Sequence, residues 1–204
     1  MQRVNIDARQ QALTGIGLMA AGIACLTVSD AIGKALTAGY TPIQILFIRN
    51  LVALPIAVLI AWRLGGRAAL RSHRPAVHLA RGAILLAAAT LFFTGLKKLG
   101  LAEATALVFA APVFITALSA FALREPVGWR RWTAVLVGFA GVLIIVRPGG
   151  AAFQAASLYP VATAFFYAVL MISARFVDPR DTVWTLMLYL TGAGALLSSL
   201  AMPF

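Results

Sequence analysis

Two long apolar runs joined by one short basic loop limit the folds open to this chain more than any other feature. The runs cover residues 103–123 and 132–146, with the loop 124–131 between them. A helix needs about 20 apolar residues to cross a hydrocarbon core of roughly 30 Å. The first run has that length. The second reaches it when Trp129 and Arg147 lie at the two interfaces, where such side chains are enriched. The pattern predicts a transmembrane hairpin with a basic turn.

Composition places the whole chain in the same class. Of its 204 residues, 62% are hydrophobic and 11% are charged, whereas a soluble domain carries about 25% charged residues. The net charge of +11 would fit nucleic-acid binding, but the basic residues are scattered between apolar segments instead of gathered on one polar face. We therefore expect a lipid bilayer as the surrounding medium and no nucleic-acid partner.

Seven apolar segments predict an all-α polytopic membrane helix bundle. They cover residues 13–36, 42–62, 79–96, 103–123, 132–146, 155–176 and 183–202. The first is too long for the core of a signal peptide, so we expect it to remain as a helix. Pro42 can open the second helix, and Pro55 predicts a kink within it. Cys25 is the single cysteine, which excludes an internal disulfide and a metal site built on cysteines.

The distribution of Lys and Arg predicts the orientation. With the N-terminus inside, twelve basic residues fall on the inner side and three on the outer side. The inner ones are Arg3, Arg9, Arg63, Arg67, Arg71, Arg74, Arg81, Arg124, Arg130, Arg131, Arg175 and Arg180, and the outer ones are Lys97, Lys98 and Arg147. Because positive charge is enriched in cytoplasmic loops, we expect a cytoplasmic N-terminus.

Several short motifs, in order and spacing, carry a family resemblance that covers essentially the whole chain. Around the hairpin they are Pro112, Leu123, Glu125, Trp129 or Trp132, and the Gly138-x-x-Gly141 pair. Nearer the N-terminus they are Asp30-x-x-x-Lys34 and Gln44 followed by Phe47-x-Arg49. Together they resemble the EamA domain of the drug/metabolite transporter (DMT) superfamily.

The resemblance implies a secondary transporter of the bacterial inner (plasma) membrane. Such proteins have ten helices in two five-helix inverted repeats, an arrangement typical of alternating access. We expect the first EamA repeat at residues 13–148 and a truncated start of the second, with two helices, at residues 154–204. The expected substrate is a small organic metabolite, moved down a gradient or with protons.

Two alternatives stay open at this stage. The chain could be a truncated transporter fragment, inactive alone or dependent on a partner half or a homodimer. It could also be an integral-membrane enzyme, although no converging acid–base set supports that class. We expect no enzymatic activity, no cofactor and no metal: His73 and His78 have no cysteine or acid cluster near them in the sequence, and no phosphate-binding glycine loop is evident.

Charged residues at membrane depth are the first candidates for a substrate site, because each costs roughly 2.5–3.5 kcal/mol at the bilayer centre. Asp30 and Lys34 share one helix face. They are interpreted either as an ion pair near the outer interface or as a gate or substrate site that faces a central cavity, and both alternatives stay open. Arg49 has no acid one turn away on its helix, and Asp30 across the turn is its candidate partner. The planar guanidinium group of arginine matches the geometry of a carboxylate. We therefore expect Arg49 to bind an anionic or carboxylate-bearing substrate. The alternative is that Arg49 only forms a structural ion pair.

Three further residues complete the candidate site. Tyr167 and Tyr189, on the last two predicted helices, are candidates for lining a substrate cavity, although aromatic residues near helix ends more often anchor the interface. Glu103 opens the fourth predicted helix, where a carboxylate favours the helix dipole. Its functional alternative is a role in proton coupling.

Overall fold

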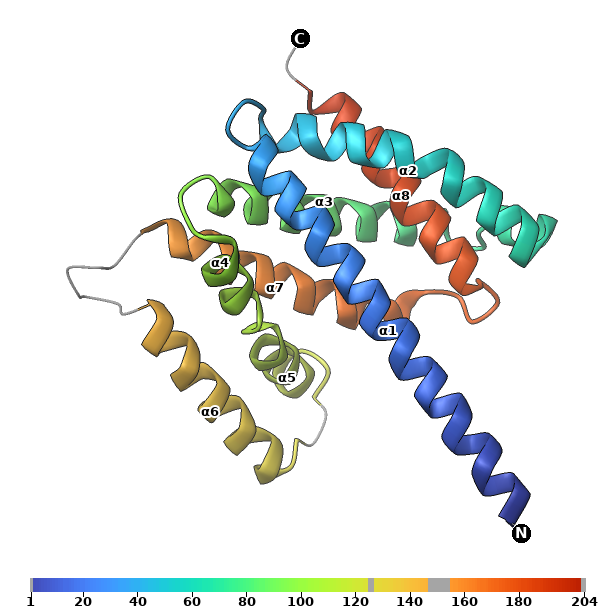
Figure 1. Cartoon of the computed structure of the whole chain (residues 1–204), viewed down its shortest axis with the longest axis horizontal. Coiled ribbons are helices and arrows are strands. Elements are labelled where there is room, and N and C mark those ends of the chain that lie inside the picture. The colour runs from blue at the N-terminus through green and yellow to red at the C-terminus, as the bar shows by residue number, and fades with distance from the viewer. Residues whose placement is uncertain (1, 125–126, 147–154, 203–204) are drawn as a thin grey trace.

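The computed structural model describes residues 2–124, 127–146 and 155–202, and every regular element in these ranges is helical (Figure 1). The helices are α1 (Gln2–Leu36), α2 (Pro42–Gly65), α3 (Pro75–Leu96), α4 (Leu101–Val108), α5 (Ala111–Phe121), α6 (Trp129–Val146), α7 (Leu158–Ser173) and α8 (Val183–Leu200), with short 3₁₀ turns at Arg67–Leu70, Ala155–Ser157 and Ala174–Phe176. The expected all-α polytopic membrane bundle is confirmed. Glu125, one of the motif residues, and Arg147, which was expected at an interface, lie outside the described residues.

Six helical stretches within the described residues are long and apolar enough to cross a membrane. They are Gln10–Leu36, Pro42–Gly65, Pro75–Leu96, Leu101–Phe121, Ala155–Phe176 and Val183–Leu200. The remaining predicted segment, 132–146, also forms a helix, α6, which has 18 residues and begins with Trp129 and two arginines. Each predicted segment is therefore helical, while the number of helices that span the bilayer stays a prediction.

The fourth predicted segment is not one continuous helix. It divides into α4 and α5 at Phe109 and Ala110, where the amide of Ala110 donates to the carbonyl of Leu107 over 3.1 Å, a tightened turn. Pro112 explains the break, because it has no N–H to donate to the carbonyl of Val108 and its ring crowds the preceding turn. Pro55, in contrast, lies inside α2 without ending it.

The start of α2 follows from its first residues. The side chain of Thr41 accepts a hydrogen bond from the amide of Gln44, whose own side chain accepts from the amide of Thr41, so the two form a capping box. Pro42 occupies the first turn, as expected. The turn that precedes this cap reverses the chain direction and brings the end of α1 beside the start of α2 (Figure 1).

Helices α2, α3, α7 and α8 form the packed centre of the molecule: α2 packs on α8, and α3 packs on both α7 and α8 (Figure 1). Small residues allow these approaches, as is typical of helices in lipid. Gly82 on α3 faces Ala193 on α8. A Cβ atom added at Gly194 on α8 would lie 2.8 Å from the side-chain nitrogen Nδ2 of Asn50 on α2.

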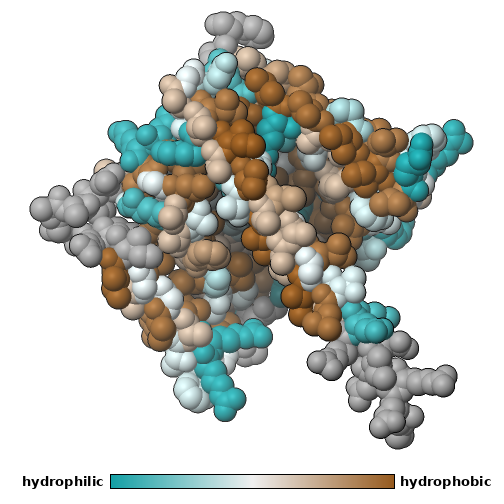
Figure 2. All heavy atoms as spheres, viewed as in Figure 1, coloured by the Kyte–Doolittle hydropathy of each residue, from teal (hydrophilic) through white to brown (hydrophobic). Residues whose placement is uncertain are grey.

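The outer surface is strongly apolar, and hydrophobic side chains cover much of the face seen in Figure 2. Helix α1 is exposed from Gln10 to Val28 and crosses one face of the bundle (Figure 1). Lipid tails are as apolar as these side chains, so a membrane removes the cost that water would impose on such a surface.

Candidate functional site

A cavity of about 210 Å³ lies among α1, α2, α3, α4, α7 and α8. Its polar lining includes Asp30 from α1, Arg49 and Asn50 from α2, and Tyr167 from α7, while Phe92 and Phe93 from α3 contribute aromatic rings. We call it the charged cavity, because it brings an acid and a base together at the depth of the predicted spans.

Asp30 and Arg49 form a loose ion pair. Nη1 of Arg49 lies 3.8 Å from Oδ1 of Asp30, and 42% of the Arg49 side chain and 23% of the Asp30 side chain remain exposed. That separation allows Coulombic attraction but is too long for a hydrogen bond. The predicted pairing across the turn between α1 and α2 is thus confirmed, whereas the role of the pair in substrate binding stays a prediction.

Lys34 does not pair with Asp30, and its role in a substrate site stays a prediction. Its Nζ donates hydrogen bonds to the carbonyl of Leu96 and, over 2.9 Å, to that of Leu99, and no ion pair joins it to Asp30 within the described part of the chain. The Leu96 carbonyl lies at the end of α3, where the helix dipole is negative and where backbone acceptors lack partners. Leu99 lies in the turn that follows α3. Lys34 therefore fastens α1 to the end of α3.

The two candidate tyrosines lie in different places. Tyr167 lines the charged cavity. Tyr189 lies instead beside the loop between α2 and α3, where its hydroxyl accepts from the amide of Ser72 over 3.2 Å and donates to the carbonyl of Leu70 over 3.4 Å. Of the described residues, those that line the cavity do not include Lys34, Glu103 or Tyr189.

Glu103 occupies the position expected from the sequence, in the first turn of α4. A carboxylate there interacts favourably with the positive end of the helix dipole. The neighbouring turn of α4 contributes Thr105 and Val108 to the cavity wall. Glu103 thus belongs to a cavity-lining helix without lining the cavity itself.

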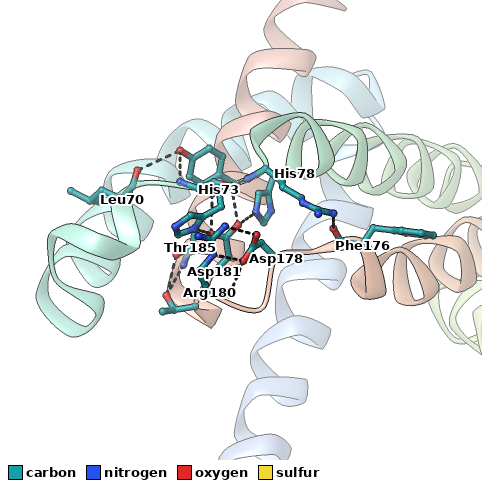
Figure 3. Close-up of polar contacts among 12 residues, drawn as sticks. Leu70, His73, His78, Phe176, Asp178, Arg180, Asp181 and Thr185 are labelled. Atoms are coloured by element: carbon teal, nitrogen blue, oxygen red, sulfur yellow. Dashed lines mark hydrogen bonds and ion pairs between the residues drawn. The ribbon is translucent and has the colours of Figure 1, made fainter.

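A second polar group, which we call the loop cluster, joins the loop before α3 to the loop before α8 (Figure 3). It consists of Ser72, His73, His78, Asp181 and Tyr189. The Asp181 carboxylate accepts four hydrogen bonds: from Ser72 Oγ at 2.9 Å, from the His73 amide at 3.1 Å, and from His73 Nδ1 and His78 Nε2 at 2.8 Å each. The Asp181 and His78 side chains are both fully buried.

Hydrogen bonding sets the charge state of the cluster. Burial alone would raise the pKa of Asp181, but the hydrogen bonds from His78, His73 and Ser72 together hold that pKa below its ordinary value. A carboxylate is an acceptor only, so both histidines donate to it. Three residues before Asp181, a bidentate hydrogen bond from the Arg180 guanidinium lowers the pKa of Asp178.

Sequence reasoning missed this cluster because His73 and His78 have no acid near them along the chain. The acid is Asp181, more than a hundred residues later. One signal could have found it: the orientation rule places both loops on the same side of the membrane. In the described part of the chain, no group of three or more His, Cys, Asp and Glu side chains is arranged to hold a metal ion.

Arg81 was counted from the sequence among the inner-side charges, an assignment that stays a prediction. The structure places it inside α3 and buries it to 5% exposure. Its Nη1 atom donates to the carbonyl of Leu170 at 2.9 Å and to the hydroxyl of Ser173 at 2.8 Å, both on α7. Arg81 therefore joins α3 to α7.

Residues 13–147 match the EamA-like transporter family. The chain belongs to this family. Members among the curated proteins share its sequence along most of its length. The chain is 31% identical over 182 residues to the S-adenosylmethionine uptake transporter of Rickettsia conorii, which covers 87% of this chain and 60% of that protein. It is 30% identical over 175 residues to the riboflavin transporter of Vibrio cholerae, which covers 85% of this chain and 59% of that protein.

The EamA-like chain thus spans about 60% of the length of these curated relatives. No solved structure matches it. Family membership and the six apolar helical stretches establish a multi-pass membrane protein of a transporter family. The match to that family points away from an enzyme.

Proposed function

We propose that this chain contributes to secondary transport, moving a small organic metabolite across the bacterial inner membrane by alternating access. The charged cavity is the substrate site in this proposal. In the proposed arrangement the N-terminus is cytoplasmic, residues 13–148 form the first repeat, and residues 154–204 begin an inverted second repeat. The named relatives support the substrate class, since S-adenosylmethionine and riboflavin are both small organic metabolites.

The loose Asp30–Arg49 pair is the observation that carries the proposal. Ionisable groups at membrane depth are costly and are retained mainly where they pair or serve a function. A guanidinium has five N–H donors, and the contact of Arg49 with Asp30 is too long for a hydrogen bond. Arg49 therefore keeps hydrogen-bonding capacity that faces a cavity, as a substrate-binding residue requires.

The remaining candidates receive different roles in this proposal. Tyr167 contacts the substrate from α7, because it shares the cavity wall with Asp30 and Arg49. Lys34 and Tyr189 act indirectly, by holding α1 to the end of α3 and α8 to the loop before α3. Glu103 is the candidate for proton coupling, on a helix that forms part of the wall.

Uptake by a purified and reconstituted protein tests the proposal. We expect Arg49→Gln to reduce uptake of radiolabelled S-adenosylmethionine or riboflavin about tenfold or more, because hydrogen bonds to a charged group contribute roughly 1.5–3 kcal/mol. Arg63→Gln is the matched control, since Arg63 lies on the same helix, in its last turn, and outside the cavity lining of the described residues. The proposal fails if Arg49→Gln transports like the wild type.

A measurement of particle size in detergent, made on the same protein preparation, shows whether the active species is a monomer, a homodimer or a complex with a partner half.

A further inference from the structure

An open apolar groove follows α2 and the loop after it. Two cavities of about 940 and 460 Å³ form this groove, and they share Leu54 on α2 and Leu70, the last residue of the 3₁₀ turn. The first cavity extends along one stripe of α2 to its last turns, and the second lies between α2, α3 and α8. We call the two together the α2 groove. Its lining on α2 consists of Leu51, Leu54, Pro55, Val58, Leu59 and Trp62.

Basic side chains gather at one end of the α2 groove. Arg67 lines the groove, and Arg63 and Arg71 lie four residues before and after it in the sequence. All three are exposed. Within the described part of the chain, the side chains of Arg67 and Arg71 form no hydrogen bond or ion pair. Their guanidinium donors are therefore available to an anion.

The membrane supplies molecules with the matching chemistry. Trp62 marks the depth of the interface, because tryptophan is enriched where helices leave the bilayer, and the guanidinium of Arg63 lies 5.8 Å from the centre of its ring. Acyl chains extend from this depth into the hydrocarbon core, while phosphate groups stay at the interface. A guanidinium pairs with a phosphate through parallel hydrogen bonds, and basic sites beside membrane helices attract anionic head groups.

We propose that the α2 groove binds an anionic phospholipid, with its phosphate at Arg67 and one acyl chain along the apolar stripe of α2. Arg63 and Arg71, on either side of Arg67 in the sequence, add positive charge around the phosphate. The lipid comes from the leaflet that adjoins the loop between α2 and α3. Of the described residues, none lines both the α2 groove and the charged cavity, so the inference does not depend on transport by this chain.

The loop that carries Arg67 and Arg71 is held in place without a lipid. The Tyr189 hydroxyl donates to the carbonyl of Leu70 over 3.4 Å and accepts from the amide of Ser72 over 3.2 Å (Figure 3). Ser72 also donates its hydroxyl to Asp181 in the loop cluster. A site that is already ordered loses less conformational entropy when a ligand binds. The loop cluster therefore preorganises the basic end of the groove.

Quenching of tryptophan fluorescence by brominated phospholipids tests the inference in proteoliposomes. The two probes are phosphatidylglycerol and phosphatidylcholine, each brominated on an acyl chain and each diluted into unbrominated phosphatidylcholine. The difference between the wild type and Trp62→Phe isolates the signal of Trp62, and Trp129→Phe does the same for Trp129. Trp129 is the matched control: Arg130 also lies 5.8 Å from its ring centre, but Trp129 is outside the lining of the α2 groove.

We expect phosphatidylglycerol to quench Trp62 at about a tenfold lower mole fraction than phosphatidylcholine, and to show a smaller preference at Trp129. Arg67→Gln should reduce the preference at Trp62 about fivefold, because one arginine near an anionic lipid surface has an effect of that size. Arg130→Gln should leave the preference at Trp62 unchanged. Added salt should weaken the preference, since the site is exposed and screened.

Three results would overturn the inference. They are equal preferences at Trp62 and Trp129 in the wild-type chain, a preference at Trp62 that survives in Arg67→Gln, and quenching of Trp62 by neither lipid, which would mean that another protein surface covers the groove. Native mass spectrometry of the wild-type chain needs no variant to fold. With both lipids supplied in equal amounts, we expect the chain to retain phosphatidylglycerol preferentially, and equal retention contradicts the proposed site.

Discussion

Asp30 and Asp181 are both withdrawn from bulk water, yet their surroundings differ completely. The Asp181 side chain is fully buried and accepts four hydrogen bonds, from Ser72 and His73 in the loop before α3 and from His78 on α3. Asp30 makes one long contact with Arg49 and stays partly exposed to a cavity. A buried acid whose acceptor sites are filled holds structure together, whereas one with unused acceptor sites beside a cavity is available to a ligand. We therefore expect the same substitution, a carboxylate replaced by an amide, to have a large effect on stability at Asp181 and a small one at Asp30.

The sharpest test replaces each acid with its amide. Asp181→Asn should lower the free energy of unfolding by about 1–3 kcal/mol, because an amide cannot accept from all the donors around it and leaves buried groups unpaired. Asp30→Asn should change it by less than about 1 kcal/mol, as is typical of partly exposed ion pairs. Equilibrium unfolding in detergent micelles measures both values. Equal losses would show that Asp30 is as structural as Asp181.

Two glycines allow the cavity wall to be changed without changing charge. Gly82→Ala should lower the free energy of unfolding by about 1–3 kcal/mol, because its new Cβ meets Ala193 on the facing helix and the helices must separate. Gly194→Ala meets the end of the Asn50 side chain, which can rotate away, so we expect a smaller loss of stability and a larger loss of binding in the charged cavity.

Gly192→Ala is the matched control on α8. Its Cβ would lie 3.7 Å from Leu54, an ordinary van der Waals separation, so both stability and ligand affinity should stay near wild type. Thermal unfolding and binding of radiolabelled S-adenosylmethionine or riboflavin, measured on all three variants, check the order. A Gly194→Ala variant with unchanged affinity would mean that the Asn50 side of the cavity does not contact the ligand.

The smallest expected effect is a dependence of stability on pH. The folded-state pKa of Asp181 is lowered, so its stabilising contribution is present above the unfolded pKa, about 4 for an aspartate, and is lost as pH falls through the folded value. Unfolding measured from neutral pH down to the acid range should show stability decreasing below about pH 4. Asp181→Asn should reduce that slope, and an unchanged slope would show that another group causes it.

Much of the fold could be predicted because few backbone structures are stable inside a bilayer. Apolar runs of the right length must be helices, and a short capped turn had to bring Asp30 near Arg49. The division between α4 and α5 has a local cause, Pro112. The apolar run is long enough for one membrane-spanning helix, so its length predicts a continuous helix there. The loop cluster and the place of Tyr189 depend on contacts between residues 100 or more positions apart, which no local pattern specifies. The carbonyl partners of Lys34, 62 and 65 positions away, also lie beyond the reach of a local pattern.

The division of the fourth segment has a mechanical consequence. Helix α4 contributes Thr105 and Val108 to the cavity wall, while α5 packs on α6 and places Phe121 edge to face against Trp132. At Phe109 and Ala110 the regular backbone ladder between them is interrupted. Hinges of this kind absorb a change in backbone angle within a few residues. A change in backbone angle at this joint would move α5 against α7, on which it packs through Phe114 and Phe165, and would leave the hydrogen bonds within α4 intact.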